Sequence, residues 1–546
     1  MYSILYKTPS FLLVLENSCY SLTPITTKAD NFAGAMRLFF KKIFSFLLLG
    51  LFILKVNAAG FDIKTSSIID QPAIEVLGDY NNNWYVIGFE KPNHPDKPAR
   101  FYILKYAAGF PTAKSSPVYP PFGEKTDYLK AAIVNGKLSI FYSRCERVVE
   151  RPDMVDSREG YKQIPKILRQ DYDPVTLLPE GEPVVIFDEA VEHFAASGIE
   201  LAQSDDKSKT AILIKHYFRQ QKFKVLLIDN NKGLVLERCF ALKTEKNDLI
   251  VFKNVVVGND GQILLEAKNQ ADPLHLDTKD KKGPRYYFFS INSKDDEPKM
   301  LNPDAEINTG QPVIAILNNG QMLISTCYYT NAHSLVLKSI GIKKYAADFT
   351  AAGAYNITPD NNFITDAASY QKTKEKGLEN VEIRQILPLD GGGFMLIAEY
   401  RHSTDTKDKV TGSISTTLER HYLLAYRFND LLSLTGSNFI DKKQTTHTFG
   451  YAFSAQAYRK GNNVYLLHND DCESDDEHGL YLLNTLLPAN GGEPNTQKIV
   501  HTSEDFFTSL EHIYTGTDNR ILFIEAKVVD FSVEARELKL LEVKVR

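Results

Sequence analysis

The sequence predicts an all-β fold, a β-propeller built from four-stranded antiparallel blades. A pattern of apolar run, Asn/Asp/Gly turn and second apolar run recurs eight times, with turns near residues 82, 135, 206, 260, 319, 391, 462 and 518. A polar loop and a third apolar run follow most copies. No segment of helical length has the 3.6-residue apolar period of an amphipathic helix.

Each repeat is predicted to form one blade. Runs rich in Val, Ile, Leu, Tyr and Phe that are joined by Asn-Gly or Asp-Gly indicate β-hairpins, as in LKAAIVNGKLSIFY from Leu129. Third strands include FYILKY from Phe101 and HYLLAYRF from His421, and a weaker fourth strand is PVVIF from Pro183. Four-stranded units that repeat roughly every 53 to 72 residues are typical of a propeller.

The ends of the pattern predict a closed ring. The eighth repeat supplies three strands, and the apolar segment at residues 61–69 has no repeat of its own. We expect this N-terminal strand to pair with the last blade, because closure removes the exposed edges of an open sheet. The count favours eight blades; seven blades with one decayed repeat, or tandem β-sandwiches, are the alternatives.

Residues 36–58 have the pattern of a secretory signal peptide. Three basic residues precede the apolar run at 43–53, and Val56-Asn57-Ala58 is a small-residue cleavage site. Residues 1–35 are then a mis-annotated start or a long leader, and residues 59–546 form a single propeller domain. We expect export to the periplasm, cell surface or extracellular space, with no membrane span after cleavage. A retained anchor is the alternative.

Composition excludes several classes of protein. The chain has 63 basic and 68 acidic residues and a formal charge of −5, which argues against nucleic-acid binding. Cys145, Cys239, Cys327 and Cys472 fall in four different repeats, so we expect mostly unpaired thiols, although export would permit disulfides. There is no CxxC motif, and therefore neither a zinc site nor a redox motif is indicated.

Two charged segments are candidate binding sites. The acidic loop from His468 to His478 predicts a Ca²⁺ site, because closely spaced carboxylates favour a hard cation. The candidate ligands are Asp470, Asp471, Glu473, Asp475 and Asp476. A basic-aromatic hairpin could meet an acidic protein or a glycan through Lys215, Arg219, Lys222 and Lys224. In the alternative interpretation both segments are solvated, and strand alternation buries the aromatic residues of the hairpin.

Searches for catalytic motifs assign no catalytic or cofactor-binding residue. Residues 204–207 and 369–372 match S-x-x-K, but neither match has a helical context. Gly391-Gly392-Gly393 lies in a hairpin turn with no helix after it, so it does not form a phosphate loop. HExxH and GxSxG do not occur.

The hairpin cores, above all LPLDGGGFMLIAEYR from Leu387, resemble those of exported bacterial β-propeller repeat proteins of unassigned activity. The WD dipeptide and the sialidase Asp-box do not occur, and the double-glycine core of kelch proteins does not recur in the repeats. The resemblance therefore implies a fold and no particular activity.

These observations favour an exported, non-enzymatic propeller that binds a protein or another ligand through the face bearing its long loops. One alternative is a polysaccharide-active hydrolase or lyase with a site at the mouth of the central channel. Another is an envelope protein stabilised by a cation. Carboxylate, His and Tyr side chains that converge at the centre of the ring would favour the enzyme.

Overall fold

In the computed structural model, the strands of the predicted propeller lie within residues Phe61–Arg546. The predicted leader and signal peptide, residues 1–58, lie outside the described residues, so both stay predictions. The structure describes residues 61–65, 73–89, 101–109, 126–149, 161–187, 199–215, 222–241, 249–270, 286–301, 309–330, 335–370, 377–407, 414–446, 455–460, 463–471, 480–488, 492–502, 506–516, 520–527 and 537–545. In this part of the chain no helix is long and apolar enough to span a membrane.

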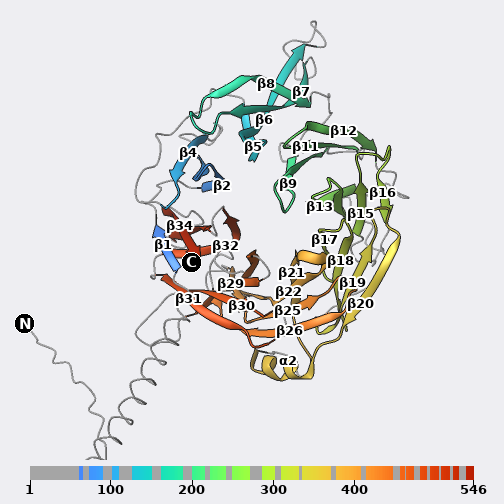
Figure 1. The fold of residues 1–546 in the computed structure, drawn as a ribbon, viewed down its shortest axis with the longest axis vertical. Coiled ribbons are helices and arrows are strands. Elements are labelled where there is room, and N and C mark those ends of the chain that lie inside the picture. Colours follow the sequence, from blue (N-terminus) through green and yellow to red (C-terminus); the bar gives the residue numbers. More distant parts are fainter. Residues whose placement is uncertain are drawn as a thin grey trace, which may run out of the picture. The chain divides into compact units, whose positions relative to one another are not determined.

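Eight antiparallel sheets follow one another around a ring, which confirms the predicted eight-bladed propeller (Figure 1). The strands of each blade are given from the innermost outward. Blade 1 consists of β2 (Ala73–Tyr80), β3 (Asn83–Phe89) and β4 (Phe101–Ala107), and blade 2 of β5 (Thr126–Val134), β6 (Lys137–Val149), β7 (Tyr161–Tyr172) and β8 (Pro179–Phe187). Blade 3 consists of β9 (Ile199–Gln203), β10 (Lys209–Lys215), β11 (Lys222–Asp229) and β12 (Gly233–Ala241), and blade 4 of β13 (Leu249–Val257), β14 (Ile263–Gln270), β15 (Tyr286–Ile291) and β16 (Lys299–Leu301).

Blades 5 to 8 repeat the same order. Blade 5 consists of β17 (Val313–Ile316), β18 (Met322–Tyr329), β19 (Leu337–Tyr345) and β20 (Ala351–Ile357), and blade 6 of β21 (Val381–Pro388), β22 (Phe394–Tyr400), β25 (Tyr422–Phe428) and β26 (Leu434–Asp441). Blade 7 consists of β28 (Ala455–Lys460), β29 (Asn463–Asp471), β30 (Leu480–Leu487) and β31 (Asn495–Thr502), and blade 8 of β32 (Phe506–Thr515), β33 (Arg520–Lys527), β34 (Glu537–Val545) and β1 (Phe61–Thr65). All eight predicted turns fall between the first and second strands of a blade.

The N-terminal strand closes the ring as predicted. β1 pairs antiparallel with β34, from Phe61 opposite Val545 to Thr65 opposite Leu541. Next to this seam, Trp84 of blade 1 is fully buried and packs with Leu522 and Leu540 of blade 8. Its indole Nε1 donates a 2.6 Å hydrogen bond to Glu542 Oε2. Apolar packing and a buried hydrogen bond thus join the first and last blades.

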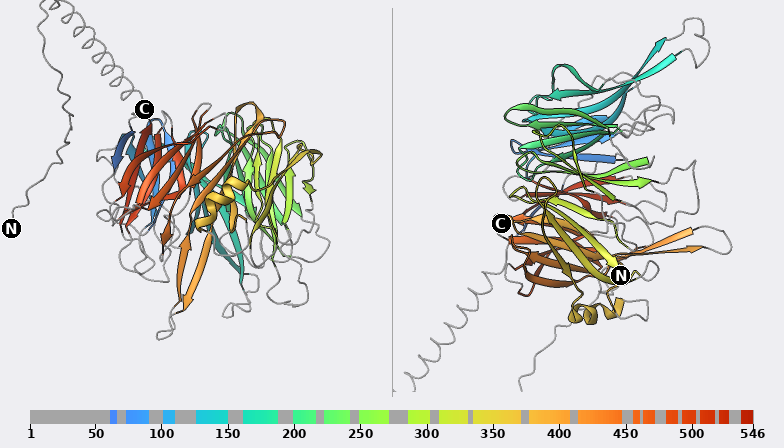
Figure 2. Two further views of the ribbon diagram at one scale, coloured as in Figure 1. Left: turned by 90° about the horizontal axis from the view of Figure 1, so that it is seen from below. Right: turned by 90° about the vertical axis from the view of Figure 1, so that its right-hand side faces the viewer.

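Blade 6 carries an insertion between its second and third strands. The sequence analysis places a polar loop between the second and third strands of most repeats, but in blade 6 β23 (His402–Lys407) and β24 (Ile414–Glu419) form a hairpin there, and β27 (Thr445–Thr446) adds a third strand. The prediction missed it because β23 is entirely polar and β24 has only two apolar residues, Ile414 and Leu418. Figure 2 shows this ribbon projecting from one face of the ring. Helical turns among the described residues are short: α2 (Asn361–Asp366), η3 (Ala367–Tyr370) and η4 (Asp390–Gly392).

Candidate functional site

Backbone irregularities mark the innermost strands. The register between the first and second strands shifts in β2, β5, β13, β21 and β32. A β-bulge bends its strand and redirects side chains, and bulges are common beside active sites. The inner wall of the ring is therefore the first place to look for converging functional groups.

Three of these irregularities lie beside a group of four polar residues, the Glu75 cluster, which consists of Glu75, Tyr128, Lys130 and Tyr514. The Tyr128 hydroxyl donates a 2.6 Å hydrogen bond to Glu75 Oε2. The Lys130 ammonium lies 2.8 Å from Glu75 Oε1. The bulge in β5 places one extra residue between Tyr128 and Lys130, and both side chains reach the same carboxylate of the neighbouring blade.

The Glu75 cluster combines buried hydroxyls with accessible charges. Burial, and then the charge of Glu75, raise the pKa of both Tyr128 and Tyr514 well above the usual tyrosine range. Both phenols therefore stay protonated at neutral pH. The side chain of Lys130 remains 43% exposed and that of Glu75 20% exposed, so a solute can reach them.

The position of the cluster follows from the topology. Each innermost strand begins at the face that carries the connections between second and third strands, here called the loop face. Glu75 and Tyr128 are each the third residue of their strand and lie nearer that face. This is the face that the sequence favours for binding, although most of its connections are outside the described residues.

At the opposite face one turn reaches across the ring. Asp205, in the turn after β9 of blade 3, forms a 3.1 Å ion pair with Arg459 of blade 7. Blades 3 and 7 are four positions apart and hence opposite each other in a ring of eight. Lys207 of the same turn donates to the Thr515 carbonyl of blade 8 at 3.1 Å. Residues 204–207, which match S-x-x-K by sequence, thus join distant blades.

A second polar group is buried in blade 6. The fully buried Glu399 carboxylate contacts Lys442 Nζ at 2.6 Å, Arg384 Nε at 3.3 Å and Arg420 Nη1 at 3.4 Å. Burial alone would raise the pKa of Glu399, but the three cations lower it overall. Lys442 is itself fully buried and Arg420 nearly so, and we assign this group to the stability of the blade.

The predicted cation site stays a prediction. Asp470 and Asp471 end β29, and the Asp470 carboxylate accepts the Lys443 backbone N–H at 2.7 Å. Glu473, Asp475 and Asp476 are outside the described residues. His468, at the start of the acidic segment, is buried and bonds Thr485, and burial followed by the charge of Lys442 lowers its pKa to about 3. Among the described residues no group of three His, Cys, Asp or Glu side chains could hold a metal ion.

The basic hairpin is only partly described. Lys215 ends β10 and Lys222 begins β11, whereas Arg219 is outside the described residues. Lys224 lies 2.7 Å from Glu237 and donates to the Ile186 carbonyl of blade 2 at 3.0 Å, so it is engaged within the fold. Phe223 is fully buried, as the alternation predicts. Partner binding by these four residues stays a prediction.

The cysteines follow the expectation where they are described. Cys239 and Cys327 form no disulfide. Cys472 is outside the described residues. Cys327 is buried, and burial raises the pKa of its thiol to about 12.

The sequence analysis missed the Glu75 cluster. Glu75 and Tyr128 are 53 residues apart and belong to different repeats. The available signal was position: each is the third residue of the first strand in a repeat, and Lys130 follows two residues after Tyr128. A comparison of the polar residues at matching positions of neighbouring innermost strands could have found the Glu75 cluster.

Solved structures share the fold at low identity. A prolyl endopeptidase is 9% identical with a TM-score of 0.35; the match covers 83% of this chain and 54% of the other, so the chain spans about half that enzyme's length. The polysaccharide lyase Uly1 is 11% identical with a TM-score of 0.35, covering 81% and 92%. A protein of unknown function from Dyadobacter fermentans DSM 18053 is 12% identical with a TM-score of 0.28, covering 62% and 95%. No protein-family model matches, and no curated protein is similar.

These comparisons correct the leading functional prediction. Prolyl endopeptidases and polysaccharide lyases are enzymes, and against this finding the prediction of a non-enzymatic scaffold is wrong. The similarity itself shows the fold alone, and the propeller fold hosts both binding and catalysis. An activity has to be argued from the side chains of this chain.

Proposed function

We propose that the protein is an exported polysaccharide lyase that cleaves a uronate-containing polysaccharide by β-elimination at the Glu75 cluster. The observation that carries the proposal is one accessible carboxylate that holds both a protonated phenol and an ammonium group. A base, an acid and a cation are the groups that this reaction needs.

Each group has a role in the reaction. Glu75 takes the proton from the carbon next to the uronate carboxylate. A double bond forms as the glycosidic C–O bond breaks, and Tyr128 gives its proton to the departing oxygen. Lys130 pairs with the substrate carboxylate, whose negative charge grows as the proton leaves. The proton then passes from Glu75 to Tyr128 along their 2.6 Å hydrogen bond, which restores the site.

The composition of the cluster favours elimination over hydrolysis. Glycoside hydrolysis generally uses two carboxylates on either side of the scissile bond. The Glu75 cluster contains one carboxylate among its four residues, and the remaining groups are two phenols and an ammonium. The raised pKa of Tyr128 suits a proton donor, because the phenol is protonated when the leaving oxygen needs a proton.

The test uses the full chain and a panel of uronate polysaccharides, among them polygalacturonate and alginate. The unsaturated product is followed by its ultraviolet absorbance. Removing a general acid costs about 10²- to 10⁴-fold in rate, so we expect Tyr128→Phe to lose that much turnover. Lys130→Met should raise KM and lower kcat, because it removes the charge that holds the substrate carboxylate.

Tyr172→Phe is the matched control. Tyr172 is also buried, in β7, and its hydroxyl has no hydrogen-bond partner among the described residues, so this change should leave turnover intact. Wild-type turnover in Tyr128→Phe would refute the assigned role. Absence of unsaturated product from every uronate polymer would refute the lyase.

A further inference from the structure

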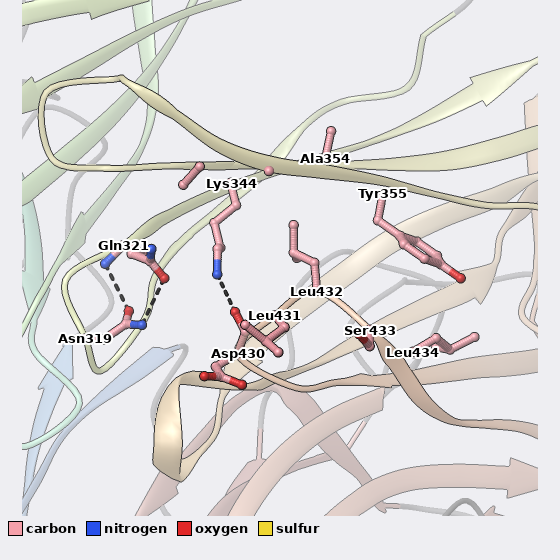
Figure 3. A pocket seen from close by; sticks show the side chains of 12 residues that line it. Asn319, Gln321, Lys344, Ala354, Tyr355, Asp430, Leu431, Leu432, Ser433 and Leu434 are labelled. Atoms are coloured by element: carbon pink, nitrogen blue, oxygen red, sulfur yellow. Dashed lines mark hydrogen bonds between the residues drawn. The ribbon is translucent and has the colours of Figure 1, made fainter.

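A large open groove lies between blades 5 and 6, apart from the Glu75 cluster (Figure 3). Its volume is about 900 Å³. Blade 5 contributes the turn after β17, one residue of β19 and the outermost strand β20, and blade 6 contributes the turn between β25 and β26. The groove is wide enough for several units of a polymer.

One wall of the groove presents a buried ammonium group. Lys344 is only 6% exposed, and its Nζ donates to the backbone carbonyl of Asp430. No carboxylate of the described residues forms an ion pair with Lys344. An ammonium has three donors, and burying a charge without a counter-ion is costly. Figure 3 shows the Asp430 carboxylate on the far side of that carbonyl from Lys344, which leaves the ammonium available to an acidic ligand.

The rest of the groove suits a saccharide. Leu431 is 79% exposed and Leu434 38% exposed, and such apolar side chains can pack against the C–H faces of sugar rings. Asn319 Nδ2 donates to Gln321 Oε1 at 2.9 Å, which orients two amides at the rim that can bond hydroxyl groups. At Gly353 a Cβ would lie 2.9 Å from Leu432 Cδ1, so glycine permits the close approach of the blades at the floor.

We infer that this groove is a second binding site for an acidic polysaccharide, with Lys344 bound to a carboxylate or sulfate of the polymer. The inference rests on the proposed function for the identity of the polymer and deepens it. Such a site would hold the substrate on the protein while the Glu75 cluster acts on another segment. The accessible leucines and amides would contact neighbouring sugar units on either side of the charged group.

The experiment is affinity electrophoresis of the full chain carrying Tyr128→Phe, so that the polymer stays intact. The gels contain polygalacturonate for carboxylate, dextran sulfate for sulfate, or neutral dextran. We expect retardation by at least one acidic polymer and none by dextran. A hydrogen bond to a charged group is worth about 1.5–3 kcal/mol, so Lys344→Met should weaken binding about tenfold or more. Leu431→Ser should weaken it more modestly.

Leu178→Ser is the matched control, because Leu178 is 62% exposed on blade 2, away from the groove. It should bind as its parent does. Parental affinity in both Lys344→Met and Leu431→Ser, or no retardation by either acidic polymer, would overturn the inference. Lyase turnover by the wild type is measured separately. Retardation that depends on Lys344 without any turnover would support the groove and count against the proposed lyase.

Discussion

Replacing Glu399 with glutamine tests how the buried charges of blade 6 are held. The substitution keeps the side-chain shape but leaves Lys442 and Arg420 buried without their shared counter-ion. Breaking a buried ion pair by removing one partner costs about 3–5 kcal/mol. The propeller unit Phe61–Arg546 has an unfolding entropy of about 1 kcal/mol/K, at roughly 2.1 cal/mol/K per residue. The expected fall in Tm is therefore about 3–5 °C.

The loss of stability in Glu399→Gln should depend on pH in a definite direction. The folded-state pKa of Glu399 is lowered, so its contribution to stability is present above the unfolded value of about 4.3. It is lost as the pH falls through the lower folded value. The difference between wild type and Glu399→Gln should be full at pH 7 and shrink in acid. His468, whose pKa is also lowered, is present in both proteins, so we expect its effect largely to cancel from the difference.

Thermal unfolding at pH 7 measures the fall in Tm, and urea unfolding at several pH values measures the loss of free energy and its dependence on pH. The matched control is Glu382→Gln in the same blade, since Glu382 is 47% exposed and pairs with the exposed Arg401. It should change stability by less than about 1 kcal/mol. A loss below about 1 kcal/mol for Glu399→Gln, or one that stays constant down to strongly acidic pH, would refute the argument that this carboxylate neutralises the buried cations.

Three further predictions concern other parts of the ring. Arg459→Ala removes the ion pair to Asp205 across the ring together with the 2.6 Å pair to Asp390 of blade 6. It should cost about 1 kcal/mol or less at low salt, and nothing measurable at high salt, by urea unfolding; an equal loss at both would contradict an electrostatic role. An alkylating reagent near pH 8 should label exposed Cys239 in the native protein and buried Cys327 only after unfolding, by mass spectrometry; equal native labelling would disprove the difference. Glu542→Leu should cost about 1–3 kcal/mol and shift the emission of Trp84, the single tryptophan, because its indole N–H loses its acceptor; unchanged emission would show that this hydrogen bond is not formed.

The repeating hairpins could be predicted because their signal is local. Each turn residue follows its apolar run by a few positions, so all eight first-to-second-strand turns were placed correctly. Pairing of the N-terminal strand with the last blade followed from counting strands, and β1 and β34 confirm it. The hairpin β23–β24 was missed because β23 is entirely polar and β24 has only two apolar residues, Ile414 and Leu418.

The candidate site was beyond local signals. The Glu75 cluster depends on bulges that shift the register by one residue and on which blades are neighbours. Asp205 and Arg459 are 254 residues apart and meet only because the ring has eight members, which places their blades opposite each other. Such contacts depend on the number of blades and on the direction of side chains, and neither can be predicted from a short stretch of sequence.

Because β1 pairs with β34, the ring can close only at the end of chain synthesis. β1 is made before any other strand of the propeller, whereas its partner is made after every other strand. Until β34 arrives, the backbone groups of β1 that will pair with it have no partner, and the edge of β33 is also exposed. The intermediate blades can form hairpins as they emerge, but the last seam must wait for residues 537–545. A chain stopped short of this strand would leave two open edges at once, and we expect it to aggregate although seven blades are intact.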